Sequence, residues 1–391
     1  MKPKLLYVID SFDRRGAQLG LLALAKNGFF DAFDLRVVGL TRGADSIYDD
    51  LIDLLGVERV VFLRETKRAK IRNSPQTIGL LRGEFDRFKP DVAVLSLIHS
   101  NLIGRVTALA FPEVKIATFE HNVANQNFLE WAALRITSGR VDLVFGDTKQ
   151  TLRSMKPYYR RDARIYDVPL TILEPTAFRE SSMPQRYKIL SCGHLTEQKN
   201  YIQLIRAIGM LTDQSYDVEL IIAGQGKQHA QLEALISKLG LGNRVHLTGF
   251  ISNQQTLQTL RHEAHIYVQP SLYEGFCLAA AEALAAGLPT VATDFAGTRD
   301  YGFHGKNMII AHEYSAEALA KSLSFLIDRY HQLAAPLSQA GIETTRERFS
   351  RYAVQALWEP AQAALALPRI LQPSSPQGSR YPQYLFPIPR R

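Results

Sequence analysis

Short apolar segments alternate with helical stretches along this chain, and the alternation starts again halfway. The apolar runs of the first series lie at residues 5–9, 35–40, 92–95, 115–119 and 143–145, with a helix expected at 17–25. The second series has apolar runs at residues 187–193, 218–223, 245–247 and 290–293. Such alternation is typical of parallel sheets covered by helices. The sequence therefore predicts an α/β protein with two facing doubly wound, Rossmann-like domains that bind ligand in the cleft between them.

A proline-containing segment separates the two series. Residues 168–184 hold Pro169, Pro175 and Pro184 among polar residues, which is the composition of a linker. We therefore expect an N-terminal domain at 1–170, a linker at 171–186 and a second domain at 187–349. A final helix is expected at 350–367, and residues 368–391, rich in Pro, Ser, Gln and Arg, are expected to be disordered.

The composition limits the classes of protein to which the chain can belong. With 391 residues and 46% hydrophobic content, it is long enough for two cores. Cys192 and Cys277 are the only cysteines, which argues against a disulfide framework or a Cys-rich zinc site and favours a reducing, cytosolic setting. The run at 5–9 is too short for a signal peptide, and no segment approaches the roughly 20 apolar residues of a membrane span. Any membrane contact is therefore expected to be peripheral.

Two carboxylates flank a predicted strand–loop–helix junction. Glu274 lies in the loop after an apolar run at 265–268, and Glu282 lies on a small-residue helix expected at 279–286. A helix N-terminus attracts phosphate through its free N–H groups and its dipole, so the two glutamates are better suited to sugar and ribose hydroxyls. Taken alone, the pair is explained equally well as a dipole-favoured glutamate and a solvated one.

Other polar residues follow strands of the second series. Lys199 lies in the loop after the first of these strands, where its ammonium group can neutralise a diphosphate, although a solvated lysine is the more frequent case. Gly224 and Gly226 follow another strand, but tight turns use glycine with or without a ligand. The sequence has no His-Glu-x-x-His motif and no Asp-x-Asp pair. We therefore expect no protein-bound metal, with Lys199, His194 and helix amides stabilising the leaving group.

The first series also ends strands on polar residues. His121 and Asn122 follow the run at 115–119, and His99 follows the run at 92–95. A structural role is the more frequent explanation for a single histidine, but strand ends that face a cleft favour a functional one. Gly16 allows close approach of backbone to a ligand or simply begins a helix. Arg14 and Arg15 beside it, with His99 and Asn122, are the candidate acceptor contacts.

Basic stretches at residues 67–72 and 156–164, the latter with Tyr158 and Tyr159, provide a candidate surface for anionic lipid. Solvated faces explain most such stretches. The net charge of +8 permits attraction to phosphates, nucleic acid or an anionic membrane. Because the basic residues do not interleave with aromatic residues in a recognisable module, nucleic acid is not an expected partner.

Five ordered motifs resemble those of the retaining family 4 glycosyltransferases (glycosyl transferases group 1), which have the GT-B architecture. They are Gly-x-Leu-x-x-x-Lys at 193–199, Ala-Gly-x-Gly at 223–226, Arg-Val-x-Leu-x-Gly-Phe at 244–250, Pro-Ser-Leu-Tyr-Glu-Gly-Phe at 270–276 and Glu-Ala-Leu-Ala-Ala-Gly-Leu-Pro-Thr-Val-Ala-Thr-Asp at 282–294. The first half matches only through Gly16, His99 and His121. The resemblance implies an acceptor domain followed by a nucleotide-sugar donor domain.

The resemblance also implies roles for single residues. Glu282 would hold the donor ribose, Glu274 the hydroxyls of the transferred sugar, and Lys199 the diphosphate, with His121 touching the sugar from the other domain. The remaining donor-site residues would be the amides of Gly275, Phe276, Cys277 and Leu278, the base-flanking Phe250 and Ile251, and Gly16 and His194. The expected catalytic residues are Glu274, Lys199 and His121.

The function implied by the resemblance is metal-independent transfer of a hexose, with retention, from a nucleotide diphosphate sugar, UDP-sugar favoured. No cofactor is expected beyond this co-substrate. The expected acceptor is a lipid-linked precursor of a cell-surface glycan, at the cytoplasmic face of the cell membrane. An epimerase of UDP-amino sugars with the same architecture and a non-catalytic sugar-nucleotide or glycan-binding protein remain alternatives.

The chain departs from the family pattern at four places. His194 stands where arginine is usual, and Cys277 stands where glycine is common. The paired glycines near the first helix are reduced to Arg15-Gly16, and Val168-Pro-Leu-Thr171 replaces an Asn-Gly-x-Asp motif. These departures concern acceptor geometry and activity more than the fold.

Overall fold

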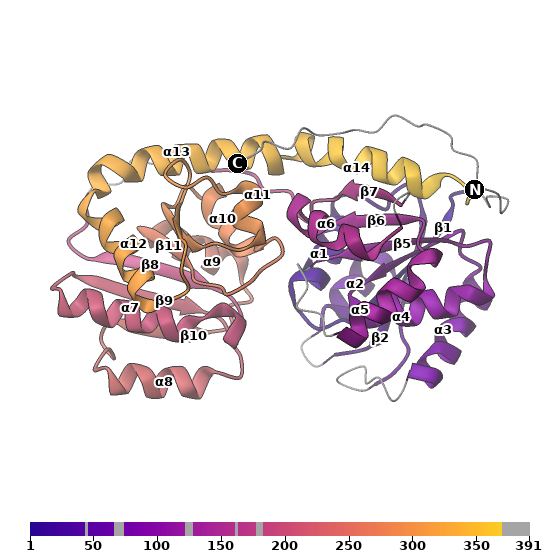
Figure 1. Ribbon diagram of the computed structural model, residues 1–391, viewed down its shortest axis with the longest axis horizontal. Coiled ribbons are helices and arrows are strands. Elements are labelled where there is room, and N and C mark those ends of the chain that lie inside the picture. Colours follow the sequence, from indigo (N-terminus) through magenta and orange to yellow (C-terminus); the bar gives the residue numbers. More distant parts are fainter. Residues whose placement is uncertain (44–45, 66–73, 122–127, 161–162, 177–182, 370–391) are drawn as a thin grey trace.

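The protein is seen here as a computed structural model, which describes residues 1–43, 46–65, 74–121, 128–160, 163–176 and 183–369. Figure 1 shows two lobes side by side, each with its own sheet and helices, and two long helices along one side. Both sheets pair all their strands in parallel. The predicted architecture of two doubly wound domains is therefore confirmed.

The first domain has a seven-stranded sheet in the order β3-β2-β1-β4-β5-β6-β7. Its strands are β1 (Lys4–Ser11), β2 (Asp34–Thr41), β3 (Val60–Phe62), β4 (Val92–Ser96), β5 (Lys115–Glu120), β6 (Leu143–Gly146) and β7 (Arg164–Asp167). The helices are α1 (Gly16–Lys26), α2 (Tyr48–Leu55), α3 (Ser74–Phe88), α4 (Ile98–Thr107), α5 (Phe128–Thr137) and α6 (Lys149–Met155). The order of strands reverses between β1 and β4, and the open crevice of such a sheet lies at this switch point.

The second domain has a six-stranded sheet in the order β10-β9-β8-β11-β12-β13. Its strands are β8 (Tyr187–Cys192), β9 (Val218–Ala223), β10 (Val245–Gly249), β11 (Ile266–Gln269), β12 (Thr290–Thr293) and β13 (Ile309–Ala311). The helices are α7 (Tyr201–Asp213), α8 (His229–Lys238), α9 (Gln254–Glu263), α10 (Leu278–Ala285), α11 (Ala296–Tyr301), α12 (Ala316–Asp328) and α13 (Tyr330–Phe349). Here the switch point lies between β8 and β11.

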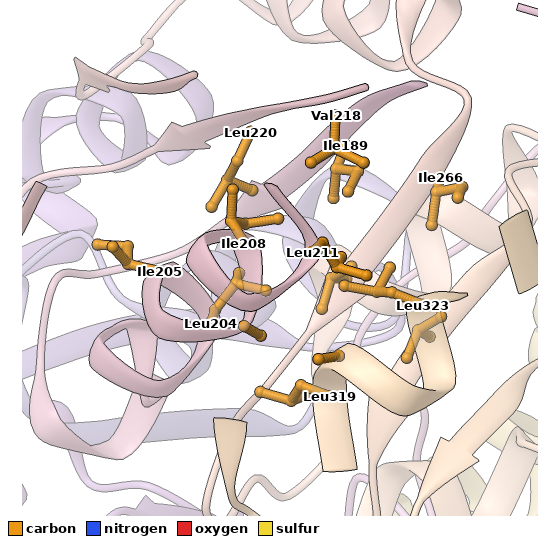
Figure 2. Packing of buried hydrophobic residues seen from close by; sticks show 14 of the residues in the cluster. Ile189, Leu204, Ile205, Ile208, Leu211, Val218, Leu220, Ile266, Leu319 and Leu323 are labelled. Atoms are coloured by element: carbon orange, nitrogen blue, oxygen red, sulfur yellow. The ribbon is translucent and has the colours of Figure 1, made fainter. Parts of the chain in front are cut away.

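The core of the second domain forms where apolar side chains on one face of α7 pack against apolar side chains of the sheet. Leu204, Ile208 and Leu211 recur at helical spacing on α7 and are fully buried. Figure 2 shows them gathered with side chains of β8, β9 and α12. The labelled partners on those elements are Ile189, Val218, Leu220, Leu319 and Leu323. Burial of each such side chain contributes about 1.5–3 kcal/mol, so this packing fixes the sheet edge that carries the loops.

The last helix, α14 (Arg351–Ala366), returns to the first domain. Figure 1 shows α13 along the second lobe and α14 along the first. Trp358 is buried in the first core, and its indole N–H donates to the carbonyl of Pro169 at 2.9 Å. At the other end of α14, the buried ammonium of Lys115 donates to the carbonyl of Ala364 at 2.6 Å. The chain thus crosses between the domains twice.

The predicted apolar runs of both series form strands within a residue or two of their expected bounds. Three short strands, β3, β7 and β13, were not predicted. The sheets lie on either side of the expected linker, and the expected final helix corresponds to α14, which completes the first core. Residues 370–391 of the expected tail lie outside the described ranges.

Candidate active site

Two loops meet at the switch point of the second domain. The loop after β8 carries Gly193, and the loop after β9 carries Gly224. A Cβ on Gly224 would lie 1.9 Å from the carbonyl oxygen of Gly193, so only glycine allows this contact between the backbones. The Gly-x-Gly at 224–226 therefore has a packing reason that needs no ligand.

Lys199 and Glu274 form an ion pair at this switch point. Lys199 follows β8 and Glu274 follows β11, and the ammonium lies 2.5 Å from Oε1 of the carboxylate. Burial lowers the pKa of Lys199, but Glu274, Cys277 and Tyr201 together outweigh this effect, and the net pKa is raised above its usual range. Ser271 also donates its hydroxyl to Glu274 at 3.0 Å. The sequence predicted both residues for ligand contacts, and the structure brings them together as each other's partner.

Glu282 has a partner that was not identified from the sequence. It lies on α10, where Arg261 of α9 ion-pairs with its Oε2 atom. Burial raises the pKa of Glu282, and the guanidinium of Arg261 opposes this shift. The carboxylate side chain is 25% exposed and the arginine side chain 10% exposed. The switch point thus holds two ion pairs. In each of them the carboxylate and the cationic side chain neutralise one another.

The N-terminus of α10 is shaped by an unusual backbone. Cys277 is the N-cap residue and adopts a left-handed conformation with φ of 62°, which accounts for the glycine common at this position in the family. Burial raises the pKa of its thiol to about 12. Phe276 packs against Tyr301 and Phe349, so its side chain belongs to the core and only its backbone can line a site. Leu278 begins the helix and is partly buried.

Phe250 and Ile251 lie directly after β10. Phe250 is 45% exposed, whereas Ile251 packs against the core cluster that contains Cys192 and Cys277. An exposed ring beside the loops of β8 and β9 provides a surface on which a base can stack.

The first domain brings His121 to the same place. Nε2 of His121 lies 2.8 Å from the Ser96 hydroxyl, and its ring stacks on Phe119 with centroids 4.6 Å apart. Nδ1 lies 3.6 Å from Oδ2 of Asp147, a residue missed from the sequence although it too follows a strand. Burial raises the pKa of Asp147, and His121 opposes this shift.

His121 and Gly275 mark a direct contact between the domains. A Cβ on Gly275 would lie 1.9 Å from the carbonyl oxygen of His121 and 3.5 Å from Oδ2 of Asp147. His194 provides a second contact, because its Nε2 lies 3.3 Å from the carbonyl oxygen of Arg14. The loops of the second domain therefore rest on strand ends of the first, as expected for a site between two domains.

A group of acidic residues lies beside these contacts. Asp167, at the end of β7, has its pKa raised to about 7, first by burial and then by Asp300 of α11 in the other domain. Lys149 and Arg348 oppose the shift, and Asp147 adds to it. Arg348 also ion-pairs with Asp300 at 3.2 Å. The interface between the domains therefore carries a carboxyl group that titrates near neutral pH.

The candidate acceptor residues lie at the switch point of the first domain, but several are already engaged. Arg14 ion-pairs with Asp50 at 2.6 Å. His99 lies 3.0 Å from Asp10, whose carboxylate also accepts from the backbone N–H of Ser100 at 2.6 Å.

The acceptor candidate Arg15 and the donor-site candidate Gly16 remain accessible. Arg15 is exposed at the N-cap of α1, and a Cβ on Gly16 would have open space around it. Asn122 lies outside the described residues.

Within the basic stretch at 156–164, Lys156, Arg160 and Arg164 are exposed, but Tyr159 is not part of that surface. Tyr159 is buried, and its hydroxyl accepts from the fully buried Arg105 at 2.9 Å and donates to Glu120. This residue therefore holds α4 to the end of β5 and cannot belong to an exposed docking surface. The stretch at 67–72 lies outside the described residues.

Within the described ranges, no group of three or more His, Cys, Asp or Glu side chains is arranged to hold a metal ion. Over the same residues, no helix is both long and apolar enough to cross a bilayer.

Comparison with known proteins identifies the second domain. Residues 174–348 match the profile of the family Glycosyl transferases group 1. The second domain belongs to this family. A relative from Methanocaldococcus jannaschii, named as an uncharacterized glycosyltransferase, is 35% identical over 157 residues, which span 40% of each chain. Poly(glycerol-phosphate) alpha-glucosyltransferase of Bacillus subtilis is 26% identical over 48% of this chain and 28% of its own length. The match thus covers less than half the length of either relative.

The fold likeness extends over both domains. The crystal structure of Anabaena HepE in complex with UDP-glucose superimposes with a TM-score of 0.74 at 17% identity, covering 92% of this chain and 99% of that one. The group 1 domain is therefore the second half of a GT-B fold, as expected from the resemblance.

Proposed function

We propose that this chain is a retaining, metal-independent glycosyltransferase that moves a hexose from a nucleotide diphosphate sugar to a glycan. The observation that carries the proposal is the pair of ion pairs, Lys199–Glu274 and Arg261–Glu282, beside the N-terminus of α10. This edge of the group 1 domain lies against His121 of the other domain. Cationic, hydroxyl-binding and amide groups thus lie together where the two domains meet.

The Lys199–Glu274 pair is poised to exchange partners. A diphosphate that enters carries negative charge and competes with Glu274 for the ammonium group of Lys199. Glu274, once released, accepts hydrogen bonds from the hydroxyls of the transferred sugar. Lys199 and the free amides of α10 then stabilise the charge that develops on the departing diphosphate.

His121 completes the site from the first domain. Its ring is oriented by Ser96 and stacked on Phe119, so its side chain is preorganised toward the transferred sugar. In the proposed mechanism the acceptor attacks on the face from which the diphosphate leaves. A diphosphate oxygen takes the acceptor proton, so no separate protein base is needed.

UDP is the nucleotide we favour, because the neighbouring fold of HepE is seen with UDP-glucose. As acceptor we propose a lipid-linked precursor of a cell-surface glycan, bound at the cytoplasmic face of the membrane. The match to a poly(glycerol-phosphate) glucosyltransferase supports a polymeric acceptor, and the net charge of +8 supports contact with an anionic surface.

Binding and turnover measurements test the roles of the two glutamates. UDP, GDP and ADP are first compared by thermal shift, in which a ligand at a hundred times its Kd adds about 2.7 kcal/mol of stability. Glu282→Ala should then weaken binding of the preferred nucleoside diphosphate. Glu274→Gln should lower turnover of the nucleotide sugar without weakening nucleoside diphosphate binding, because it removes the competitor for Lys199. Equal loss of affinity in both variants would contradict this division of roles.

The same measurements separate the alternatives. Isomerised UDP-sugar formed without acceptor would identify an epimerase. Tight binding with neither hydrolysis nor transfer over a panel of acceptors would identify a binding protein.

A further inference from the structure

Arg261 is a charged residue close to the proposed nucleotide site to which no role is yet assigned. It lies on α9, the helix that follows Phe250 and Ile251, and its side chain reaches α10. The side chain is only 10% exposed, although arginine is among the residues least often buried. We propose that Arg261 is a positioning residue for the nucleotide, holding Glu282 ionised and oriented to accept hydrogen bonds from ribose hydroxyls. This inference rests on the proposed function.

Stability alone gives a weak reason for the pair. Nε of Arg261 is buried and has no hydrogen-bond partner among the described residues. A buried donor left unpaired costs free energy, and a buried ion pair contributes well to stability only when its remaining donors and acceptors are satisfied. The Arg261–Glu282 ion pair is therefore poorly suited to stabilising the fold. It is well suited to keeping the carboxylate of Glu282 charged inside the protein.

The geometry leaves part of Glu282 available to a ligand. Arg261 contacts Oε2, and the described residues provide no hydrogen-bond donor to Oε1. The side chain of Glu282 retains 25% exposure, which leaves it partly accessible to a ligand. An ionised carboxylate is a stronger acceptor for hydroxyls than a protonated one.

Arg261 is also the cation that balances Glu282. Lys199 is engaged by Glu274 at 2.5 Å. The thiols of Cys192 and Cys277 also interact with Glu282. Burial raises the pKa of each thiol to about 12, so both remain neutral. Burial raises the pKa of Glu282, and Arg261 opposes this. Without the guanidinium group, protonation of Glu282 moves toward neutral pH.

Arg261→Met tests this prediction by removing the charge while keeping an apolar side chain of similar length. Calorimetric titration with UDP, GDP and ADP gives the ratio of variant to wild-type Kd, in which titration of the nucleotide itself cancels. The ratio should reach about tenfold or more near pH 6 and fall toward pH 8.5, because Glu282 regains its charge as the pH rises. Arg261→Lys, which keeps the charge, should restore a nearly flat ratio.

Lys188→Met is the matched control. Lys188 of β8 forms an ion pair at 3.4 Å with Glu263, which lies on α9 as Arg261 does. Both side chains of this control pair are exposed. Removing this charge should leave the Kd ratio near one at every pH. A pH-dependent ratio in the control equal to that of Arg261→Met would overturn the inference, as would a flat ratio in Arg261→Met.

Two further outcomes keep the test decisive. If Arg261→Met does not fold, the double variant Arg261→Met with Glu282→Gln removes both charges, and its ratio to Glu282→Gln alone should not depend on pH. A pH-dependent ratio there would overturn the inference. If wild-type protein binds none of the three nucleotides, the proposed function itself fails, whereas binding with a flat Arg261→Met ratio removes only the role of Arg261.

Discussion

The two domains share one topology but use their switch points differently. In the second domain, Lys199–Glu274 and Arg261–Glu282 pair side chains that come from different loops and helices. In the first domain, the carboxylate of Asp10 accepts from both the backbone N–H and the hydroxyl of Ser100 at the start of α4. The second domain thus pairs its carboxylates with the largely buried cationic side chains of Lys199 and Arg261, whereas Asp10 of the first domain is bound by the start of α4. In the proposed function, the pairs of the second domain are the ones that exchange partners with the donor.

Among the variants that test this comparison, Lys199→Met should have the largest effect on stability and on binding. It leaves the carboxylate of Glu274 buried without its cation, which typically costs about 3–5 kcal/mol. Urea unfolding should show the loss of stability, and titration should show loss of nucleoside diphosphate binding. The exposed Lys188→Met should change the unfolding free energy by less than about 1 kcal/mol.

The double variant Lys199→Met with Glu274→Gln extends this test. It should recover most of the stability, because no uncompensated charge remains, but it should not recover binding. Recovery of binding would show that Lys199 acts only as a structural partner of Glu274.

Gly275→Ala should have the next largest effect and acts on the contact between the domains. The added Cβ would overlap the carbonyl oxygen of His121, so the loop and the strand end must move apart. Overpacking of about 1–3 kcal/mol should lower turnover by about tenfold to a hundredfold. Steady-state kinetics measure this loss. Gly83→Ala on α3, where a Cβ meets nothing within 4 Å, should leave turnover unchanged; an equal loss there would remove the steric explanation.

Asp167→Asn should have the smallest effect and sharpens the role of the interface. The folded pKa of Asp167, about 7, lies above the ordinary aspartate value, so the folded state keeps a proton that the unfolded state releases. Its contribution to stability is therefore complete at low pH and is lost as the pH rises from about 4 to about 7. The variant, which mimics the protonated form, should be more stable above pH 7 by about 1–3 kcal/mol and equal to wild type near pH 4.

Chemical unfolding across this pH range measures the difference, with Asp86→Asn on the exposed face of α3 as control. A stability difference that stays constant with pH would contradict the titration of Asp167 in the folded protein.

Much of the fold could be predicted because buried parallel strands are continuous apolar runs, as at β1, β4 and β8. The strands β3, β7 and β13 could not, since they have only three or four residues and lie next to polar segments. Helix α14 was predicted as a helix, but its place in the first core depends on tertiary contacts of Trp358 that no local pattern encodes.

The site shows the same division. Glu274 and Lys199 could be singled out because each lies in a motif after a strand, and Glu282 because it lies on the small-residue helix that follows Glu274. Arg261 could not, because it lies 21 residues before Glu282 and the two meet only through the packing of α9 beside α10. Asp147 follows β6, so the rule that selected His121 would also have selected it.

The position of α14 has a consequence for the order in which the protein is made. Synthesis proceeds from the N-terminus, and domains generally fold as they leave the ribosome. The first domain cannot do so completely, because Val354, Trp358 and Leu365 of its core are translated after the whole of the second domain. Until then, the apolar face that receives them stays open on the nascent chain and offers a binding surface to chaperones.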